Sequence, residues 1–485
     1  KDTRMDTTPS PQTNLKKNAF GVPSILFFVF SAQAPLTGIV GAAGLAVALG
    51  NGAGAPSAYL AVGLVIVLFA VGFTTVTRTI DAHGGFFAVI RAGLGQRVGT
   101  SGSLLALLSY NTVQFAMYGL LGASLSSLLA NDLGLHLPWW LGALAAIALV
   151  WFLGSRNVEL GAKVLAVLVS LEFLLLSAFA VGVIVTKGLG ALNVAGSFSP
   201  GAFFYGAPGV AVMFAIASMF GFESTAIYAA EAKDPHRTVP RATYISVIII
   251  AVFFALVIWM LIVYYGSANA QPAALDVLST DPTQFVLQPL NAILGPWAGS
   301  VAQILLCTSL LAGVQAFHNM ITRYFHALAE HHVFPHLLAR TNRHQAPWIA
   351  AITQTILAVA GVAAFAIPGL DPITNLFTWF SGLAVLALVV LYVLSSVAIP
   401  AYFRRHPAPY PLWQTLIAPA LATLCMAAVL WMVIDNFDAL VGGNGPVMWT
   451  LLITVPTVAV IGLLIRQPTS RTNGPTDRKP TAEAS

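Results

Sequence analysis

Charged residues are scarce in this chain of 485 residues, since Asp, Glu, Lys and Arg together make up only 8% of it. A soluble globular domain carries about 25% of such residues. Hydrophobic residues reach 58% and the mean hydropathy is +0.83. The composition therefore excludes a soluble protein and makes the lipid bilayer its surroundings. The net charge of +5 comes without a clustered basic face, so we expect no nucleic acid among its partners.

Cysteine is also rare: Cys307 and Cys425 are the two in the chain, and both fall in apolar segments. A disulfide framework or a thiolate metal site is therefore not expected. The histidines between residues 326 and 336 lack an accompanying set of Cys or carboxylate ligands, so we expect no metal. No GxxxxGK(S/T) phosphate loop occurs, which leaves ATP-driven transport unsupported. Without a nucleophile–base pair or a metal set, we expect neither an enzyme nor a bound cofactor.

Long apolar segments dominate instead. We mark twelve, and nearly all reach the roughly 17–25 residues that cross the hydrocarbon core as a helix. They lie at 20–48, 57–78, 98–129, 138–154, 161–186, 208–232, 241–266, 295–329, 347–366, 372–396, 412–433 and 446–466. The third and eighth are longer than one crossing requires, which indicates tilt or an extension beyond the membrane. The predicted fold class is an all-α integral membrane protein with 12 transmembrane helices.

Basic residues are unevenly distributed over the loops between these segments. With the loops assigned alternately to two sides, every Lys and Arg except Lys187 falls on the side of the N-terminal tail. The positive-inside rule then places both termini in the cytoplasm and the chain in the plasma membrane. The tails, 1–18 and 467–485, are rich in Pro, Thr and charge, so we expect them to be cytoplasmic and disordered.

Two of the twelve segments are interrupted by polar residues, prolines and glycines: the first between residues 31 and 41, the sixth at 218–223. Because the interruptions are five spans apart, spans 1–5 and 6–10 form two halves of opposite orientation. Matched broken helices favour an inverted-repeat transporter with its site at the midplane, although simple kinks at Pro and Gly are the alternative. The predicted 5+5 inverted repeat, with discontinuous helices 1 and 6, occupies 19–400, and two C-terminal helices occupy 401–466.

Four passages carry a resemblance to a known group of proteins. The most specific is GFESTAIYAAEAKDPHRTVPRA at 221–242, a Gly-Phe-acidic triplet followed by a Glu and a polar loop with Arg and Pro. The others are FGVPSILFFVFSAQAPLTGIVGAAG at 20–44, GGFFAVIRAGLGQRVG at 84–99, and the basic run at 323–335. Together they resemble the amino acid–polyamine–organocation (APC) superfamily of secondary transporters. The resemblance covers roughly residues 20–400 and implies transport of amino acids or related amines.

The chain departs from the superfamily at two places. The closely spaced glycines that cradle a substrate carboxylate in the first helix are replaced by APLTGIVG at 34–41. Proline removes one backbone donor, so fewer N–H groups are available for a carboxylate. Glu172 stands in the fifth helix where many members have a lysine. Its apolar neighbours make this carboxyl group a candidate proton carrier, and a neutral Glu hydrogen-bonded between helices is the alternative.

Backbone groups freed at the two breaks form the predicted substrate site. The free N–H groups around Thr37–Gly41 in the first helix would face a carboxylate, and carbonyl groups near Ala217–Phe222 in the sixth would hold an ammonium. The resemblance implies that Phe222 is an aromatic lid, with a core- or lipid-facing ring as the alternative. Glu223 either contacts an amine or caps the restarting helix, and the polar stripe of the third helix either lines a cavity or bonds another helix. The predicted substrate-binding residues are Ala34, Thr37, Gly38, Ile39, Gly41, Tyr110, Gln114, Ala217, Ser218, Gly221, Phe222 and Glu223.

The combined prediction is a secondary active transporter that imports an amino acid or a related small organic amine by alternating access. Proton coupling through Glu172 is favoured over Na⁺, for which Thr308 and Ser309 on the eighth helix are the candidate ligands. The alternatives are a polyamine or organocation carrier, an amino-acid exchanger, and a non-transporting nutrient-sensing receptor with the same fold. The sequence leaves the substrate, the coupling ion and the direction of transport open.

Overall fold

The computed structural model describes residues 21–80, 85–156, 162–223, 225, 233–278, 280–330, 333–342 and 346–465, and every regular element within them is helical. The helices that build the body are α1 (Val22–Gln33), α3 (Ala55–Val76), α5 (Gln96–Leu133), α6 (Trp139–Ser155), α7 (Ala162–Lys187), α10 (Pro208–Ala217), α12 (Pro235–Tyr265), α15 (Trp297–Glu330), α16 (Trp348–Ala366), α17 (Thr378–Arg405), α18 (Ala418–Asp435) and α20 (Pro446–Leu464). Shorter helices join them: α2 (Ala43–Leu45), α4 (Phe86–Leu94), α8 (Val194–Phe198), α9 (Pro200–Phe203), α13 (Ala270–Leu278), α14 (Gln284–Leu294) and α19 (Phe437–Val441). The predicted tails, 1–18 and 467–485, lie outside the described residues.

In the described part of the chain, nine helical segments are long and apolar enough to cross a membrane. One of them, Thr37–Val76, runs from the first predicted segment into the second. Two further predicted segments contain helices that are too short to be counted as membrane spans. The fourth contains α6, which has 17 residues, and the sixth contains α10, which has 10 residues and ends at a break. The first segment is likewise divided, because α1 has only 12 residues. The chain is thus an all-helical membrane protein, and interruption and shortness explain why fewer continuous spans are found than predicted.

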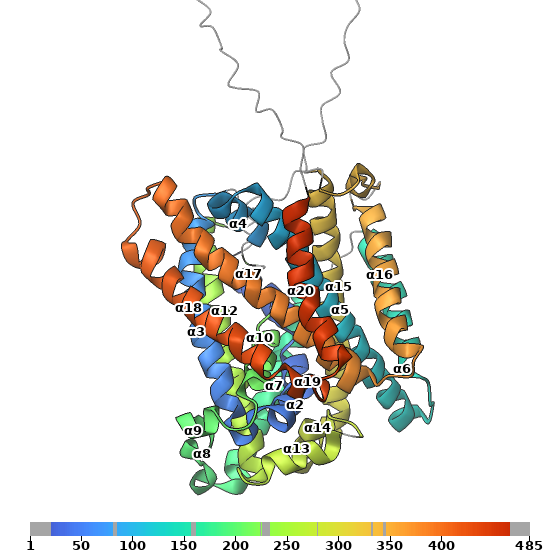
Figure 1. Ribbon diagram of the computed structural model, residues 1–485. Helices are drawn as coiled ribbons and strands as arrows, with labels where there is room; N and C mark the ends of the chain where they lie inside the picture. Colours follow the sequence, from blue (N-terminus) through green and yellow to red (C-terminus); the bar gives the residue numbers. More distant parts are fainter. Residues whose placement is uncertain are drawn as a thin grey trace, which may run out of the picture.

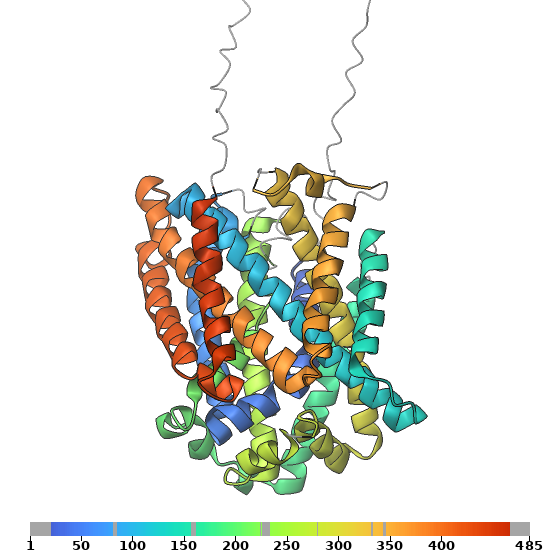
Figure 2. The same ribbon diagram turned by 45° about the vertical axis from the view of Figure 1, so that its right-hand side comes forward.

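The predicted extra length of the third and eighth segments is confirmed. Helix α5 has 38 residues and α15 has 34. At 1.5 Å per residue they are about 57 Å and 51 Å long, well beyond a hydrocarbon core of about 30 Å. Figure 2 shows α5 crossing the body obliquely, so part of its length is taken up by tilt. It packs against α15 and α17 along its course, which places it at the centre of the helix bundle.

Two connecting helices correspond to each other in the two halves of the chain. Helix α4 directly precedes α5, and α14 directly precedes α15. Each ends at a glycine of positive φ and extended ψ: Gly95 at φ 92° and ψ 173°, and Gly295 at φ 104° and ψ 164°. Helix α4 lies at one end of the molecule, whereas α13 and α14 lie at the other (Figure 1). Similar local structures therefore recur about 200 residues apart, at opposite ends of the bundle.

The outward faces of the body are apolar. Large hydrophobic side chains are exposed there, including Leu64 on α3, Leu174 and Val185 on α7, Ile356 on α16 and Leu424 on α18. An extensive exposed apolar surface marks contact with a membrane or partner. Polar side chains, in contrast, gather inside, where Gln33, Glu172, Ser218, Glu223 and Ser309 are all buried. The polar groups suited to a functional site therefore lie in the interior of the bundle.

Candidate substrate site at two helix breaks

The first predicted break lies directly after α1. Ala34 ends this helix in a left-handed conformation, with φ 46° and ψ 77°, which is uncommon for a residue with a Cβ atom. Pro35 follows and has no N–H group. The chain then resumes as a wide π-helical turn, Thr37–Gly41, in which all five residues are buried. The discontinuity is thus concentrated at Ala34.

One detail of the prediction needs correction at this break. The N–H groups of Thr37–Gly41 were expected to be free for a ligand, but that of Gly38 donates to the carbonyl of Ala34 over 3.1 Å. The reason is that the chain returns to a helical path immediately after Pro35, so the usual backward hydrogen bonds form again. The donor that points away from its own segment is instead the N–H of Leu36.

The N–H group of Leu36 is hydrogen-bonded to Glu172. Its Oε2 atom accepts a hydrogen bond from the Leu36 N–H over 3.0 Å, and the hydroxyl of Ser309 donates to the same carboxyl group. Glu172 comes from α7 and Ser309 from α15, so three separate parts of the chain meet here. Only 1% of the Glu172 side chain is exposed. The structure therefore brings two of the three predicted coupling residues together at the first break.

The third coupling candidate, Thr308, is placed differently. Its hydroxyl donates to the carbonyl of Leu305 in the same helix over 2.9 Å. Adjacent helical residues point about 100° apart, so Thr308 and Ser309 cannot both face α7 and the first break. Of the two hydroxyls, that of Ser309 reaches the break.

The second predicted break follows α10, which ends at Ala217. Residues 218–223 form turns, and Gly221 has a φ of 101°, a conformation that suits glycine. Glu223 folds back on this turn, with its Oε2 atom accepting from the Gly221 N–H over 3.1 Å. This contact closes the turn on itself, because Gly221 precedes Glu223; capping of the restarting helix by Glu223 stays a prediction. Residues 224 and 226–232 of the predicted sixth span lie outside the described residues.

The two breaks lie against each other. The side-chain amide of Gln33 donates to the carbonyl of Met219 over 3.5 Å, which joins the end of α1 to the second break. A Cβ atom added to Gly38 would lie 3.2 Å from Cβ of Ser218, so these backbones approach closely. The hydroxyl groups of Ser218 and Tyr59 are 3.3 Å apart. The predicted meeting of the two broken segments is thus observed as contacts.

Aromatic rings surround the end of the second break. The Tyr110 hydroxyl donates to Oε1 of Glu223 over 3.4 Å. The Phe222 ring is fully buried and lies 5.8 Å from the ring of Tyr392 and 6.2 Å from that of Phe69. The Tyr110 ring in turn lies 6.1 Å from that of Tyr324. We call Phe69, Tyr110, Phe222, Tyr324 and Tyr392 the aromatic cluster.

Several members of this arrangement were not predicted from the sequence. Tyr392 lies in the tenth predicted segment, and its buried hydroxyl has no hydrogen-bond partner among the described residues. Tyr59 in α3 and Gln33 in α1 were likewise missed as contacts of the second break. A polar side chain within an otherwise apolar span was the available signal for all three.

Gln114 contacts other helices instead of either break. Its side-chain amide donates to the carbonyl of Val314 in α15 over 2.8 Å, and its oxygen accepts from Gln354 in α16 over 2.5 Å. Gly41 faces Leu120 of α5 and the Phe377 ring. Of the polar stripe on α5, Tyr110 therefore reaches the second break, and Gln114 joins three helices.

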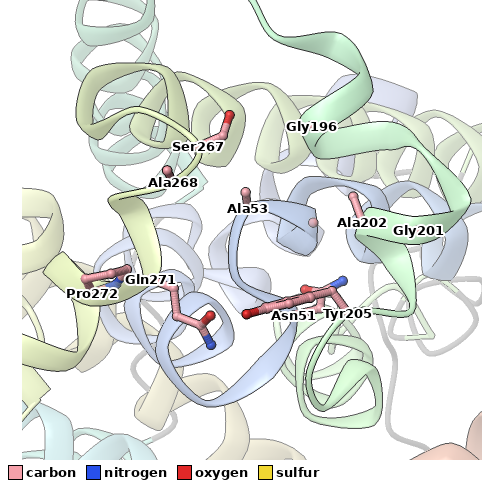
Figure 3. A pocket seen from close by; sticks show the side chains of 11 residues that line it. Asn51, Ala53, Gly196, Gly201, Ala202, Tyr205, Ser267, Ala268, Gln271 and Pro272 are labelled. Carbon is pink, nitrogen blue, oxygen red and sulfur yellow. The ribbon is translucent and has the colours of Figure 1, made fainter.

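A cavity of about 470 Å³ is lined by residues of α8, α9 and α13 (Figure 3). These three helices lie at one end of the molecule (Figure 1). Figure 3 shows the side chains of Asn51, Tyr205 and Gln271 around it. None of the predicted site residues lines this cavity. Its polar groups are amides and hydroxyls, and the described residues of the chain contain no group of three or more His, Cys, Asp or Glu suited to a metal ion.

Comparisons with known proteins agree with this architecture. The family model described as "Amino acid permease" matches residues 20–461. An uncharacterized transporter of Legionella pneumophila is 26% identical over 343 residues, which cover 67% of this chain and 70% of that protein. The L-lysine transport protein of Corynebacterium glutamicum is 25% identical over 313 residues, which cover 61% of this chain and 58% of that protein.

A solved structure is similar in fold. The crystal structure of MhsT in complex with L-phenylalanine superposes with a TM-score of 0.52 and covers 87% of this chain and 100% of that one. Because the sequence identity is 16%, this likeness bears on the fold alone.

Proposed function

The chain belongs to the amino acid permease family of the APC superfamily, and from this we propose that it imports an amino acid or a related small organic amine across the plasma membrane. The observation that carries the proposal is the contact between two broken helices in the interior of the bundle. Interrupted helices at membrane depth are tolerated where they face protein or a water-filled cavity, and transporters use them to bind solutes. The family is one of transporters and not of enzymes.

We further propose twelve transmembrane helices, with a 5+5 inverted repeat in 19–400 and helices 11 and 12 in 401–466. The matching glycine ends of α4 and α14 support this arrangement, because the two helices lie at opposite ends of the molecule (Figure 1). The two broken segments, five spans apart, support it independently. Alternating access would then follow from one group of helices rocking against the other.

The proposed orientation has both termini in the cytoplasm. Arg405 donates to the carbonyl of Gly93 in α4 over 3.2 Å, so the basic end of α17 lies at the α4 end of the molecule. Arg91 is in the last turn of α4 itself. Lys187 ends α7 and is followed closely by α8, at the opposite end. An excess of Lys and Arg on the α4 side supports a cytoplasmic assignment for that side.

The substrate is proposed to lie between the breaks, next to Gly38, Ser218 and Phe222, with Phe222 as its lid. The coupling ion is proposed to be H⁺, carried by the carboxyl group of Glu172. This carboxyl group is buried at the first break and accepts a hydrogen bond from the backbone there. A change in the protonation of Glu172 would therefore alter a hydrogen bond of the broken helix itself.

The test is transport by purified protein in liposomes. Labelled amino acids and amines are supplied under an inward proton gradient, an inward Na⁺ gradient, or none, with protein-free liposomes as the control. We expect saturable uptake that exceeds the control and rises with the proton gradient. Uptake driven by Na⁺ alone would overturn the coupling assignment. Absence of protein-dependent uptake across the whole panel would overturn the transport function.

A further inference from the structure

The backbone donor at the first break is already occupied by a carboxylate of the chain itself. We infer that the substrate is an organic amine without a free carboxylate, because Glu172 holds the N–H group that a substrate carboxylate would use. This inference rests on the transport function proposed above and specifies the class of its substrate.

Few backbone donors are available at the break. The N–H of Ala34 donates to the carbonyl of Phe30 over 2.9 Å, and Pro35 has none. The N–H of Gly38 donates to the carbonyl of Ala34. The Leu36 N–H leaves this local pattern and points to α7, where Glu172 accepts it over 3.0 Å. A ligand carboxylate that used this backbone N–H would have to displace the one already bound. The hydroxyl of Thr37, which is buried without a hydrogen-bond partner among the described residues, is the donor that this break still offers.

Displacement is disfavoured by the way Glu172 is held. Its carboxyl group also accepts from the hydroxyl of Ser309, and its side chain is 1% exposed. Hydrogen bonds between a charged group and a neutral partner are stronger than those between neutral groups, and more so away from water. Two carboxylates at one buried position would also repel each other. Glu172 therefore excludes a second carboxylate from the Leu36 N–H by occupying this donor and, in its deprotonated form, by its charge.

The groups at the second break are suited to a cation. Glu223 is buried there with Tyr110 on one of its oxygens and the Gly221 N–H on the other. The aromatic cluster packs around this position, and the faces of aromatic rings attract organic ammonium groups. The hydroxyl of Tyr392 is buried without a hydrogen-bond partner among the described residues, so it can accept from an ammonium N–H. The site thus offers groups for an amine while its carboxylate position is filled.

Matched compounds test the inference on the wild-type protein. Each set contains an amino acid, its amide and the amine formed by its decarboxylation: L-lysine, L-lysinamide and 1,5-diaminopentane, and L-phenylalanine, its amide and phenethylamine. Binding is measured as thermal stabilisation of the purified protein over a range of ligand concentrations. In the set that binds, we expect the amide and the amine to bind about tenfold or more tightly than the amino acid, the scale of a charged hydrogen bond.

A substitution of Glu172 tests whether this residue causes the preference for compounds without a carboxylate. Glu172→Ala removes the occupant, so the preference for the amide over the amino acid should narrow by about tenfold. Glu330→Ala is the matched control, because Glu330 is exposed at the end of α15 and pairs with His326. We expect this control to retain the wild-type preference. If Glu172→Ala does not fold, the wild-type comparison decides the substrate class alone.

The outcomes separate this inference from the proposed function. Tighter binding or faster uptake of the amino acid than of its amide and amine would overturn the inference and leave transport intact. A preference for amines that is identical in the wild type, Glu172→Ala and Glu330→Ala would overturn the role of Glu172. If no compound binds and none enters liposomes, the proposed function fails together with the inference.

Discussion

Replacing Gly38 by alanine tests the packing that holds the two broken segments together. The added Cβ would lie 2.7 Å from Cε2 of Phe254, which is 0.7 Å short of the 3.4 Å where ordinary contact begins. The Phe254 ring is fully buried and packs edge-on against Tyr59 at 6.0 Å, so it cannot shift without moving that ring. Overpacking of this kind costs about 1–3 kcal/mol. We expect Gly38→Ala to reduce the free energy of unfolding by that amount.

The same substitution should weaken substrate binding. The Tyr59 hydroxyl lies 3.3 Å from that of Ser218, so a displaced Tyr59 disturbs the second break. The measurements are the thermal unfolding midpoint in detergent and the increase in midpoint produced by substrate. Gly190→Ala is the matched control, since Gly190 is exposed and an added Cβ would meet nothing within 4 Å. We expect the control to resemble the wild type in both measurements.

A second substitution identifies the atoms responsible. Phe254→Leu removes the ring atoms that the new Cβ would meet, so the double variant with Gly38→Ala should recover part of the lost stability. Residues in contact show such non-additivity, whereas distant ones do not. Equal midpoints for Gly38→Ala and Gly190→Ala, or strictly additive effects of the two substitutions, would refute the reasoning.

Three further substitutions address the proposed roles. Glu172→Gln should abolish stimulation of uptake by a proton gradient while binding in detergent persists; intact gradient-driven uptake would contradict the proton-carrier role. Phe222→Ala should raise the substrate concentration needed for half-maximal uptake several-fold, since aromatic contacts contribute about 0.5–1.5 kcal/mol, and unchanged affinity would remove its role as a lid. Gln114→Leu should lower the unfolding midpoint, because it loses its bond to Val314, at an average cost of about 0.6 kcal/mol. Altered substrate selectivity in Gln114→Leu would instead indicate that Gln114 is a substrate-binding residue.

The general position of both breaks could be predicted, because Pro, Gly and polar residues interrupt otherwise continuous apolar runs. The backbone conformation at a break could be predicted only where a glycine is present, because glycine readily adopts a positive φ. Gly221, with a φ of 101°, is the example. Ala34 carries no comparable signal, since alanine rarely has a positive φ and its neighbours must impose it. The sequence therefore located the first break within an interval of residues 31–41 but not at its turning point.

The partner of Glu172 could not be predicted for a different reason. A buried carboxyl group in an apolar helix must be satisfied, but its donor is the backbone N–H of a leucine 136 positions away. Every residue except proline has a backbone N–H group, so the residue type does not indicate which N–H will bind a side chain. In the sequence, this leucine is simply one residue of an apolar run. Ser309, in contrast, could be predicted as a candidate because a hydroxyl in a span is visible in the sequence. The side chains of the site could thus be predicted from the sequence, whereas the backbone groups that they bind could not be predicted.

The hydrogen bond between the two broken segments is weak compared with those inside each segment. The bond from Gln33 to Met219 measures 3.5 Å. It is longer than the usual hydrogen-bond range and contributes less than the roughly 1 kcal/mol of an average bond. Within the second break, by contrast, Ser218 donates to the carbonyl of Phe214 over 2.8 Å. Separation of the two segments therefore breaks a long bond and preserves a short one, which favours rocking of one helical group against the other.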